Sequence, residues 1–424
     1  MEIKSLLKKG FWTLLARIIG AILVFVMTLL FARWLGPEDF GLFSLGLTIM
    51  TIMAVIARWG TDQVLLKQVG AHYELDPVIA NSYVRKSIKL IIILSLIFTI
   101  ITTIFHEELS IFIFNKPEFS YPLLWFGLLL GIFSLNYALG EALKGIGKTV
   151  LASYLQNALA ILLTITISMI LFLIEKVNLI NLIQALFLGT IIAFLVTIIM
   201  WSRQSLKGSS KEITVFSIFK EGYPMLLISS GALVMAWTDT LVLGILATSE
   251  EIGIYTVATK IALISSLLLF AMNSITAPKY AKFYNERNFY ELRRLAQNSS
   301  KILLLLIFPP TLLILIFPEV LLSLFGDEFI VGVNVLMILA VGQFINVASG
   351  SVGYILTMTD HENEMTKIMI ITALINIVLS IVLIHIYSFI GVAVATAMSV
   401  SIWNIWAAIT IKSKLGFWIY SYKS

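Results

Sequence analysis

The sequence predicts an all-α protein that crosses a membrane many times, in two similar halves. Of its 424 residues, 59% are hydrophobic and only 12% are charged, whereas soluble domains average about 25% charged residues. Apolar stretches recur along the whole chain, which excludes a soluble domain with a single membrane anchor. The second half also repeats short patterns of the first half at an offset of 212 residues.

Runs of about 20 apolar residues, the length that crosses a bilayer as one helix, indicate twelve membrane spans. The predicted spans cover residues 11–35, 40–59, 88–105, 119–139, 150–174, 179–201, 222–247, 252–277, 302–325, 331–359, 368–386 and 389–411. Connections as short as residues 36–39 leave no room for a folded domain between spans.

The repeat divides these spans into two sets of six. Residues 38–43 align with residues 250–255, and Ser87 aligns with Ser299. Because six is an even number, both sets have the same orientation and are related by a pseudo-two-fold axis along the membrane normal.

We therefore expect two six-helix bundles, residues 1–207 and 208–424, around a central cleft. Two such bundles can rock against each other and open the cleft to either side in turn, as many secondary transporters do. A transporter is the leading function class, and an enzyme is not expected.

The basic residues predict the orientation of the chain. Of the 29 lysines and arginines, 23 fall in the terminal segments and in alternate loops on the same side. Only Lys116 and Lys176 fall in loops on the other side. Because cytoplasmic loops are rich in Lys and Arg, we expect both termini in the cytoplasm. The other four basic residues lie inside spans or at their ends: Arg17, Arg33, Arg58 and Lys260.

Several kinds of site are not expected. The chain contains no cysteine, and its four histidines are scattered, so neither a metal nor another cofactor is expected. Residues 143–149 resemble a phosphate-binding loop, but Ala142 stands where that motif needs glycine. The basic, aromatic residues 279–297 fit a membrane surface with anionic lipid headgroups better than a nucleic acid.

Charged residues inside spans are costly and need a partner, water or a function. Arg17 lies about 9 Å from the cytoplasmic end of the first span, and it either reaches the headgroups or faces the cleft. Arg58 either faces the cleft or pairs with Asp62, four residues later. Asp239 and Lys260 lie at matching depths, and they either form an ion pair between neighbouring helices or serve in transport.

A second set of candidates consists of two intramembrane amides, two charges at the cytoplasmic end of the fourth span, and a proline pair. These residues are Asn157 and Asn376, Glu141 and Lys144, and Pro309 and Pro310. The amides either bind a polar ligand or join helices. The two charges either line the mouth of the cleft or are solvated loop charges, and the prolines form either a hinge or a packing kink.

Two motifs resemble those of a known family. Residues 32–43 read ARWLGPEDFGLF, and residues 239–244 read DTLVLG, followed by IGIY at residues 252–255 and ATK at residues 258–260. The chain resembles the multidrug/oligosaccharidyl-lipid/polysaccharide exporter superfamily, and within it the polysaccharide-unit (O-antigen type) flippases.

This resemblance implies alternating-access transfer of an undecaprenyl-diphosphate-linked oligosaccharide. The glycan would move from the cytoplasmic to the outer leaflet of a bacterial cell membrane, for the biosynthesis of surface polysaccharide. Under this interpretation Arg17 and Arg58 meet the diphosphate, and Asp239 with Lys260 gates transport or couples it to H⁺ or Na⁺. A polysaccharide polymerase is an expected partner, and a nucleic acid is not.

Two other functions stay open. A cation-coupled drug or metabolite antiporter of the same superfamily would share the fold, with Asp239 as its proton or sodium carboxylate. A membrane-embedded polysaccharide polymerase is the enzyme alternative. Its chemistry would need a large outer loop, whereas the longest one here, residues 106–118, is short.

Overall fold

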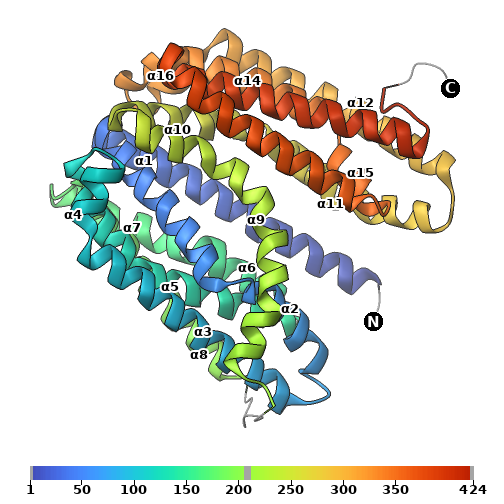
Figure 1. Ribbon diagram of the computed structural model, residues 1–424, viewed down its shortest axis with the longest axis horizontal. Helices are drawn as coiled ribbons and strands as arrows, with labels where there is room; N and C mark the ends of the chain where they lie inside the picture. The colour runs from blue at the N-terminus through green and yellow to red at the C-terminus, as the bar shows by residue number, and fades with distance from the viewer. Residues whose placement is uncertain (1–2, 205–211, 421–424) are drawn as a thin grey trace. The chain divides into compact units, whose positions relative to one another are not determined.

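The computed structural model of the chain describes residues 3–204 and 212–420, and of residues 3–11, 14 and 227–236 it describes only the backbone. Helices make up nearly all of this part of the chain (Figure 1). Those of the first half are α1 (Ile3–Arg58), α2 (Thr61–His72), α3 (Pro77–Ile104), α4 (His106–Glu108), the π-helix η1 (Leu109–Ile113), the 3-10 helix η2 (Pro117–Phe119), α5 (Ser120–Gly145), α6 (Thr149–Tyr154), the π-helix η3 (Leu155–Leu159), α7 (Ala160–Leu173) and α8 (Leu179–Ser202).

The second half continues in the same way. Its helices are α9 (Val215–Leu246), α10 (Ser249–Leu263), α11 (Ser266–Asn285), α12 (Phe289–Ile316), α13 (Pro318–Ser323), the 3-10 helix η4 (Asp327–Gly332), α14 (Val333–Ala348), α15 (Val352–Met358) and α16 (Glu362–Leu415). Helices α12, α14 and α16 pack side by side.

The chain forms two compact units, Met1–Ser230 (unit 1) and Gly231–Ser424 (unit 2). The division lies inside α9, so the first part of this helix packs with unit 1. The predicted boundary between residues 207 and 208 lies outside the described residues, and the predicted pair of bundles stays a prediction.

Many of the helices can cross a membrane. Within the described residues, eight helices are long and apolar enough to do so, or nine if α10 and α11, which meet at a bend of 42°, form one span. The chain is therefore a multi-pass membrane protein, as the sequence predicts. The predicted number of twelve is not reached by this count.

Two of the counted helices contain a sharp corner. In α1 the corner is at Gly36, with φ 72° and ψ 174°, and in α16 it is at Ser388, with φ 51° and ψ −145°. Glycine adopts the positive φ at Gly36 without the steric cost that other residues incur. Phe31 packs edge-on against Phe43 across this corner, with 5.2 Å between ring centroids. Both corners fall where the sequence predicts a connection between spans.

The first part of α9 is fixed to unit 1 at the junction of α1 and α2. The Trp59 ring stacks on Phe219, with centroids 4.5 Å apart, and its Nε1 donates to the Phe219 carbonyl oxygen at 3.1 Å. A Cβ atom added to Gly222 would lie 2.2 Å from the Trp59 carbonyl oxygen. Gln68 Nε2 also donates to the carboxylate of Glu221 at 3.1 Å. The backbones meet so closely here that only glycine fits at position 222.

The segment after α16 folds back onto unit 2. Phe417 and Ile419 are buried in a cluster with residues of α11, α12 and α15. Tyr420 Oη donates to the carbonyl oxygens of Ser300, at 3.2 Å, and Ala348. Tyr420 thus joins α12 and α14.

Candidate functional site

Unit 1 contains a buried cluster of paired charges on α1, α2 and α5. Arg58 Nε lies 2.9 Å from Asp62 Oδ2, and Lys144 Nζ lies 2.6 Å from Glu141 Oε1. Both basic groups face the Tyr137 ring, with Arg58 Cζ at 4.5 Å and Lys144 Nζ at 5.9 Å from its centroid. We call these five residues and Gln156 the charge cluster.

Gln156 completes the charge cluster from the π-helix η3. Its Nε2 donates to Glu141 Oε1 at 3.1 Å and to the Tyr137 carbonyl oxygen at 2.8 Å. A Cβ atom on Gly140 would lie 2.4 Å from that Nε2, so the glycine makes room for the amide. Isolated π-helical turns are frequent at functional sites.

The charge cluster keeps unused hydrogen-bonding capacity. Arg58 Nη1, Asp62 Oδ1 and Gln156 Oε1 are buried and form no hydrogen bond with the described part of the chain. Burial raises the pKa of the Asp62 carboxyl, and Arg58 beside it acts in the opposite direction. Since buried polar groups are normally paired, this cluster can bind water or a polar ligand.

Other predicted candidates in unit 1 lie near the charge cluster. Arg17 is exposed on α1 and interacts electrostatically with Tyr137. Asn157 follows Gln156 on η3, where its Nδ2 donates to the Ser153 carbonyl oxygen at 2.9 Å. A Cβ atom on Gly20 would lie 2.9 Å from Asn157 Cβ, so α1 and η3 touch at this point.

Two of the alternatives left open by the sequence are decided here. The pairing of Arg58 with Asp62 is observed. Glu141 and Lys144 are not solvated loop charges, because Glu141 is only 5% exposed and Lys144 packs over Tyr137. No sequence pattern indicates their burial, since the end of a helix is usually solvated.

Unit 2 holds a different polar cluster, around Asp239 of α9. The Tyr255 hydroxyl donates to Asp239 Oδ2 at 2.6 Å, and the Thr396 hydroxyl lies 2.8 Å from Oδ1 and 2.7 Å from Oδ2. Asn376 Nδ2 donates to Thr396 Oγ1 at 3.2 Å. Asp239 is buried. Its neighbours come from α10 and from the two segments of α16 on either side of the corner at Ser388. We call these four residues the aspartate cluster.

Lys260 does not neutralise Asp239. It is half-buried on α10, five residues beyond Tyr255, and among the described residues no ion pair joins it to Asp239. The ion pair that the matching depths indicate is therefore not observed. A tyrosine and a threonine hold the carboxylate instead.

The start of α10 positions Tyr255. Thr248 and Glu251 form a capping box, in which each side chain accepts from the other's backbone N–H, at 3.2 and 2.9 Å. Glu251 also accepts a hydrogen bond from Ser388 at the corner of α16. The hydrogen bond from Ser388 links α10 to the corner of α16, and this corner lies between the segment with Asn376 and the segment with Thr396.

The predicted hinge residues lie within a continuous helix. Pro309 and Pro310 are inside α12, which ends at Ile316, and Pro318 begins α13. Their hinge role stays a prediction.

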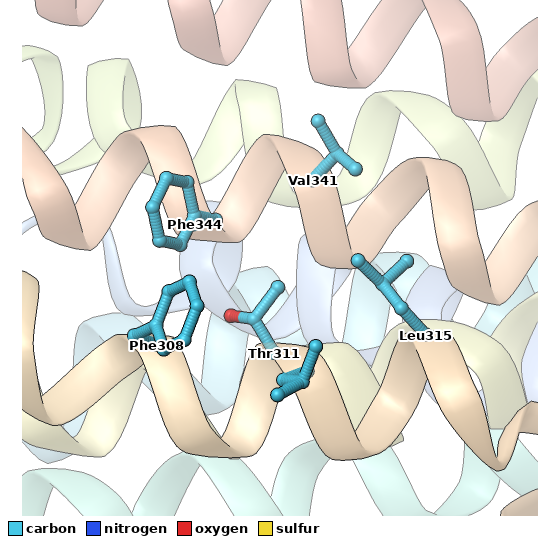
Figure 2. A pocket seen from close by; sticks show the side chains of 6 residues that line it. Phe308, Thr311, Leu315, Val341 and Phe344 are labelled. Carbon is cyan, nitrogen blue, oxygen red and sulfur yellow. The ribbon is translucent and has the colours of Figure 1, made fainter.

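Beside these prolines is an apolar cavity of about 210 Å³ between α12 and α14 (Figure 2). Its lining residues are Phe308, Thr311, Leu312, Leu315, Val341 and Phe344. The Thr311 hydroxyl donates to the Ile307 carbonyl oxygen, so this cavity suits a hydrocarbon and not a sugar.

Sequence reasoning missed Tyr137, Gln156, Tyr255 and Thr396. Tyr255 falls inside a quoted motif, at the position that aligns with Phe43 of the first half, and this exchange of Phe for Tyr was a usable signal. The other three carry no local signal, because hydroxyls and amides are common in apolar helices.

Within the described residues, no group of three or more His, Asp or Glu side chains could hold a metal ion.

The two clusters are suited to different chemistry. The charge cluster offers two cations that can exchange their carboxylate partners for another anion. The aspartate cluster has one carboxylate among neutral hydrogen-bond donors, and this can bind and release a single small cation.

Comparison with known proteins identifies the family. Residues 6–284 match the family model described as polysaccharide biosynthesis protein, and residues 224–382 match MatE. The chain is 24% identical over 401 residues to the probable low-salt glycan biosynthesis flippase Agl15 of Haloferax volcanii, covering 92% of this chain and 79% of that protein.

Solved structures share the fold. An inward-facing multidrug resistance MATE family transporter of the MOP superfamily has a TM-score of 0.76 and 17% identity, covering 95% of this chain and 98% of that one. The lipid II flippase MurJ, in an inward closed conformation, has a TM-score of 0.75 and 15% identity, covering 96% and 87%. The expected transporter class, as opposed to an enzyme, agrees with these relatives. The chain belongs to the polysaccharide biosynthesis protein family, whose model matches more than half of it.

Proposed function

We propose that this chain flips a lipid-linked oligosaccharide across the membrane by alternating access. The observation that carries the proposal is the similarity to a glycan flippase over 92% of the chain. The charge cluster supports it, because Arg58 and Lys144 offer two buried cations to a diphosphate. The expected use is polysaccharide biosynthesis, with a polysaccharide polymerase as the partner that consumes the flipped unit.

The proposal includes twelve spans in two bundles of six around a central cleft. At 1.5 Å per residue, the apolar part of α1 is about 66 Å long and α16 is about 81 Å long, whereas the hydrocarbon core is about 30 Å thick. Their corners at Gly36 and Ser388 support two spans in each. Helix α9, whose middle side chains are not described, supplies a further span. The excess of basic residues on one side supports cytoplasmic termini.

In this mechanism the diphosphate enters from the cytoplasm and meets Arg17, Arg58 and Lys144. Asp62 and Glu141 would release their partners to the phosphates, and Gln156 and Asn157 would face the glycan. The lipid chain stays in the bilayer. The resemblance of the sequence predicts an undecaprenyl carrier, an O-antigen type glycan and a bacterial cell membrane. The relative described above is archaeal, so these three points stay predictions.

The aspartate cluster would couple transport to a cation. Asp239 has hydrogen-bond donors but no cationic partner in the described part of unit 2, so binding of H⁺ or Na⁺ would neutralise a buried charge. Asn376 and Thr396 offer oxygen atoms beside it. Lys260, on the same helix as Tyr255, would act as a gate through repulsion of that cation.

Deletion of the gene tests the flippase proposal. Cells that lack the chain should accumulate a polyprenyl-linked oligosaccharide on the cytoplasmic face, where an added membrane-impermeant glycosidase reaches it only after the cells are opened. Wild-type protein should reverse the accumulation, and Arg58→Ala at equal protein level should not. If no lipid-linked glycan accumulates, the chain is not a glycan flippase.

A drug or metabolite antiporter is the second candidate. The match of residues 224–382 to MatE favours it, because that segment contains Asp239 and Asn376. Altered sensitivity to cationic drugs, with normal surface glycan, in the deletion strain would support this function in place of the first.

A further inference from the structure

A row of polar groups extends from the aspartate cluster along the contact between α14 and α16. On α16 it contains Thr396, Ser399 and Asn404, and on α14 it contains Gln343 and Asn346. Asn404 Nδ2 donates to Asn346 Oδ1 at 3.1 Å, and Asn346 Nδ2 donates to Gln343 Oε1 at 3.2 Å. We call these five residues the polar seam.

The length of the polar seam follows from the positions of its residues on α14 and α16. Gly342 lies against Ala397, where an added Cβ atom would be 3.0 Å from Ala397 Cα, so α14 and α16 touch next to Thr396. From Thr396 to Asn404 the seam follows α16 for about 12 Å. Asn346 then lies within one turn of the last residue of α14, Ala348.

At this point the membrane span is broken. Residues 349–351 separate α14 from α15 inside a span counted from Asp327 to Met358, and Gly350 has φ 76°. A Cβ atom on Gly350 would lie 2.0 Å from Ser300 Oγ of α12. Irregular backbone at membrane depth occurs where protein buries it or where it lines a water-filled cavity.

Several polar atoms along this row have no protein partner. Within the described chain, Asn376 Oδ1, Ser399 Oγ, Asn404 Oδ1, Ser351 Oγ and Ser300 Oγ are buried and form no hydrogen bond. Polar residues that only join helices would be paired with each other. A row of unpaired atoms is instead typical of positions that hydrogen-bond to internal water.

We propose that the polar seam is a hydrated path for the coupling cation, H⁺ or Na⁺, between Asp239 and the break at residues 349–351. The inference rests on the proposed coupling role of Asp239. The cation reaches or leaves the carboxylate through the interior of unit 2, on a route separate from that of the glycan. The seam contains no charged side chain, so it can conduct a cation without trapping it. Tyr420, bonded to Ser300 and Ala348 beside the break, covers its end.

Cysteine labelling tests the hydration of the polar seam independently of transport. The chain has no native cysteine, so Ser399→Cys and Ser351→Cys each introduce a single thiol with little change in volume. Ile405→Cys is the control, because Ile405 is 55% exposed on the apolar surface of α16. In proteoliposomes, a small methanethiosulfonate reagent should label the cysteine at position 399 in the seam and the cysteine at position 351 in the break at least about tenfold faster than this control, since the reactive thiolate forms in water and not in lipid. Rates equal to that of Ile405→Cys would overturn the proposal.

Cation flux tests the route. Proteoliposomes would contain wild-type protein and a polyprenyl-diphosphate oligosaccharide as the coupled substrate. Uptake of H⁺ is measured with an internal pH dye and uptake of Na⁺ with ²²Na⁺, and the assay that responds identifies the cation. Asn404→Leu should slow that flux to the level of Asp239→Asn. Ser401→Ala should match wild type, because within the described residues the Ser401 hydroxyl donates only to the Ala397 carbonyl oxygen of its own helix. If Asp239→Asn stops the flux and Asn404→Leu does not, the path is refuted and the coupling site stands. If Asp239→Asn conducts normally, the proposed coupling role fails and the path fails with it.

Discussion

The charge cluster of unit 1 and the aspartate cluster of unit 2 compensate their charges in opposite ways. In unit 1, two cations and two carboxylates form two salt bridges, Arg58–Asp62 at the junction of α1 and α2 and Lys144–Glu141 on α5, and both cations lie over the ring of Tyr137. In unit 2, a single carboxylate is held by hydroxyls. An anionic substrate can exchange with the paired carboxylates in the first case. Only a cation can neutralise the charge in the second, so the two clusters are suited to ligands of opposite charge.

The largest effect should come from breaking the charge cluster. Arg58→Ala leaves the buried Asp62 carboxylate without its partner, which should lower the free energy of unfolding by about 3–5 kcal/mol and abolish flipping. Thermal unfolding of purified protein measures the first effect. The double variant Arg58→Leu with Asp62→Leu should recover most of the stability but no flipping. Full flipping by the double variant would remove this pair from the substrate site.

The next largest effect should separate charge from hydrogen bonding in the aspartate cluster. Asp239→Asn keeps an oxygen that accepts from Tyr255 and Thr396 but cannot be neutralised by a cation. It should fold normally and lose cation-driven flipping. Tyr255→Phe keeps the charge and removes one donor, which should cost about 1.5–3 kcal/mol of stability and leave some coupled flipping. Unchanged cation dependence in Asp239→Asn would contradict the contrast between the two units.

A moderate effect on stability should come from disturbing the contact between the first part of α9 and Trp59 in unit 1. Gly222→Ala would place a Cβ atom 2.2 Å from the Trp59 carbonyl oxygen, and such overpacking costs about 1–3 kcal/mol. The matched control is Gly131→Ala on α5, where the nearest atom, Ser95 Cβ, is 3.6 Å away. The control should be neutral or slightly stabilising, since alanine favours helix. Equal melting temperatures for the two variants would show that α9 is not fixed to unit 1 at this point.

The smallest effect should be a pH dependence from Asp62. Burial raises the pKa of this carboxyl, so the folded state binds its proton more tightly than the unfolded state does. The resulting stabilisation is fully present below the unfolded pKa, which is about 3.9, and is lost as the pH rises through the folded pKa. The melting temperature of wild type should therefore fall with pH over this range more steeply than that of Asp62→Asn. Parallel curves would show that Asp62 has an ordinary pKa.

The fold class was accessible from the sequence because lipid imposes strong rules on composition and on the placement of charges. The corners at Gly36 and Ser388 coincide with connections read from apolar run lengths. The partners of Asp239 were not accessible, because Thr396 lies 157 residues away and looks like any threonine of an apolar helix. Equal depth suggested Lys260 as the partner, but depth says nothing about which face of a helix a side chain occupies. The burial of Glu141 depends on the packing of α5 against η3, which apolar patterning does not encode.

Flipping by purified protein tests the central claim most directly. Liposomes would carry a polyprenyl-diphosphate oligosaccharide with a fluorescent sugar, and an impermeant quencher would report how fast the label crosses the bilayer. Wild-type protein with an imposed H⁺ or Na⁺ gradient should move the label well above the rate of protein-free liposomes, and Arg58→Ala and Asp239→Asn should not. Wild-type rates that equal those of protein-free liposomes under both gradients would contradict the account.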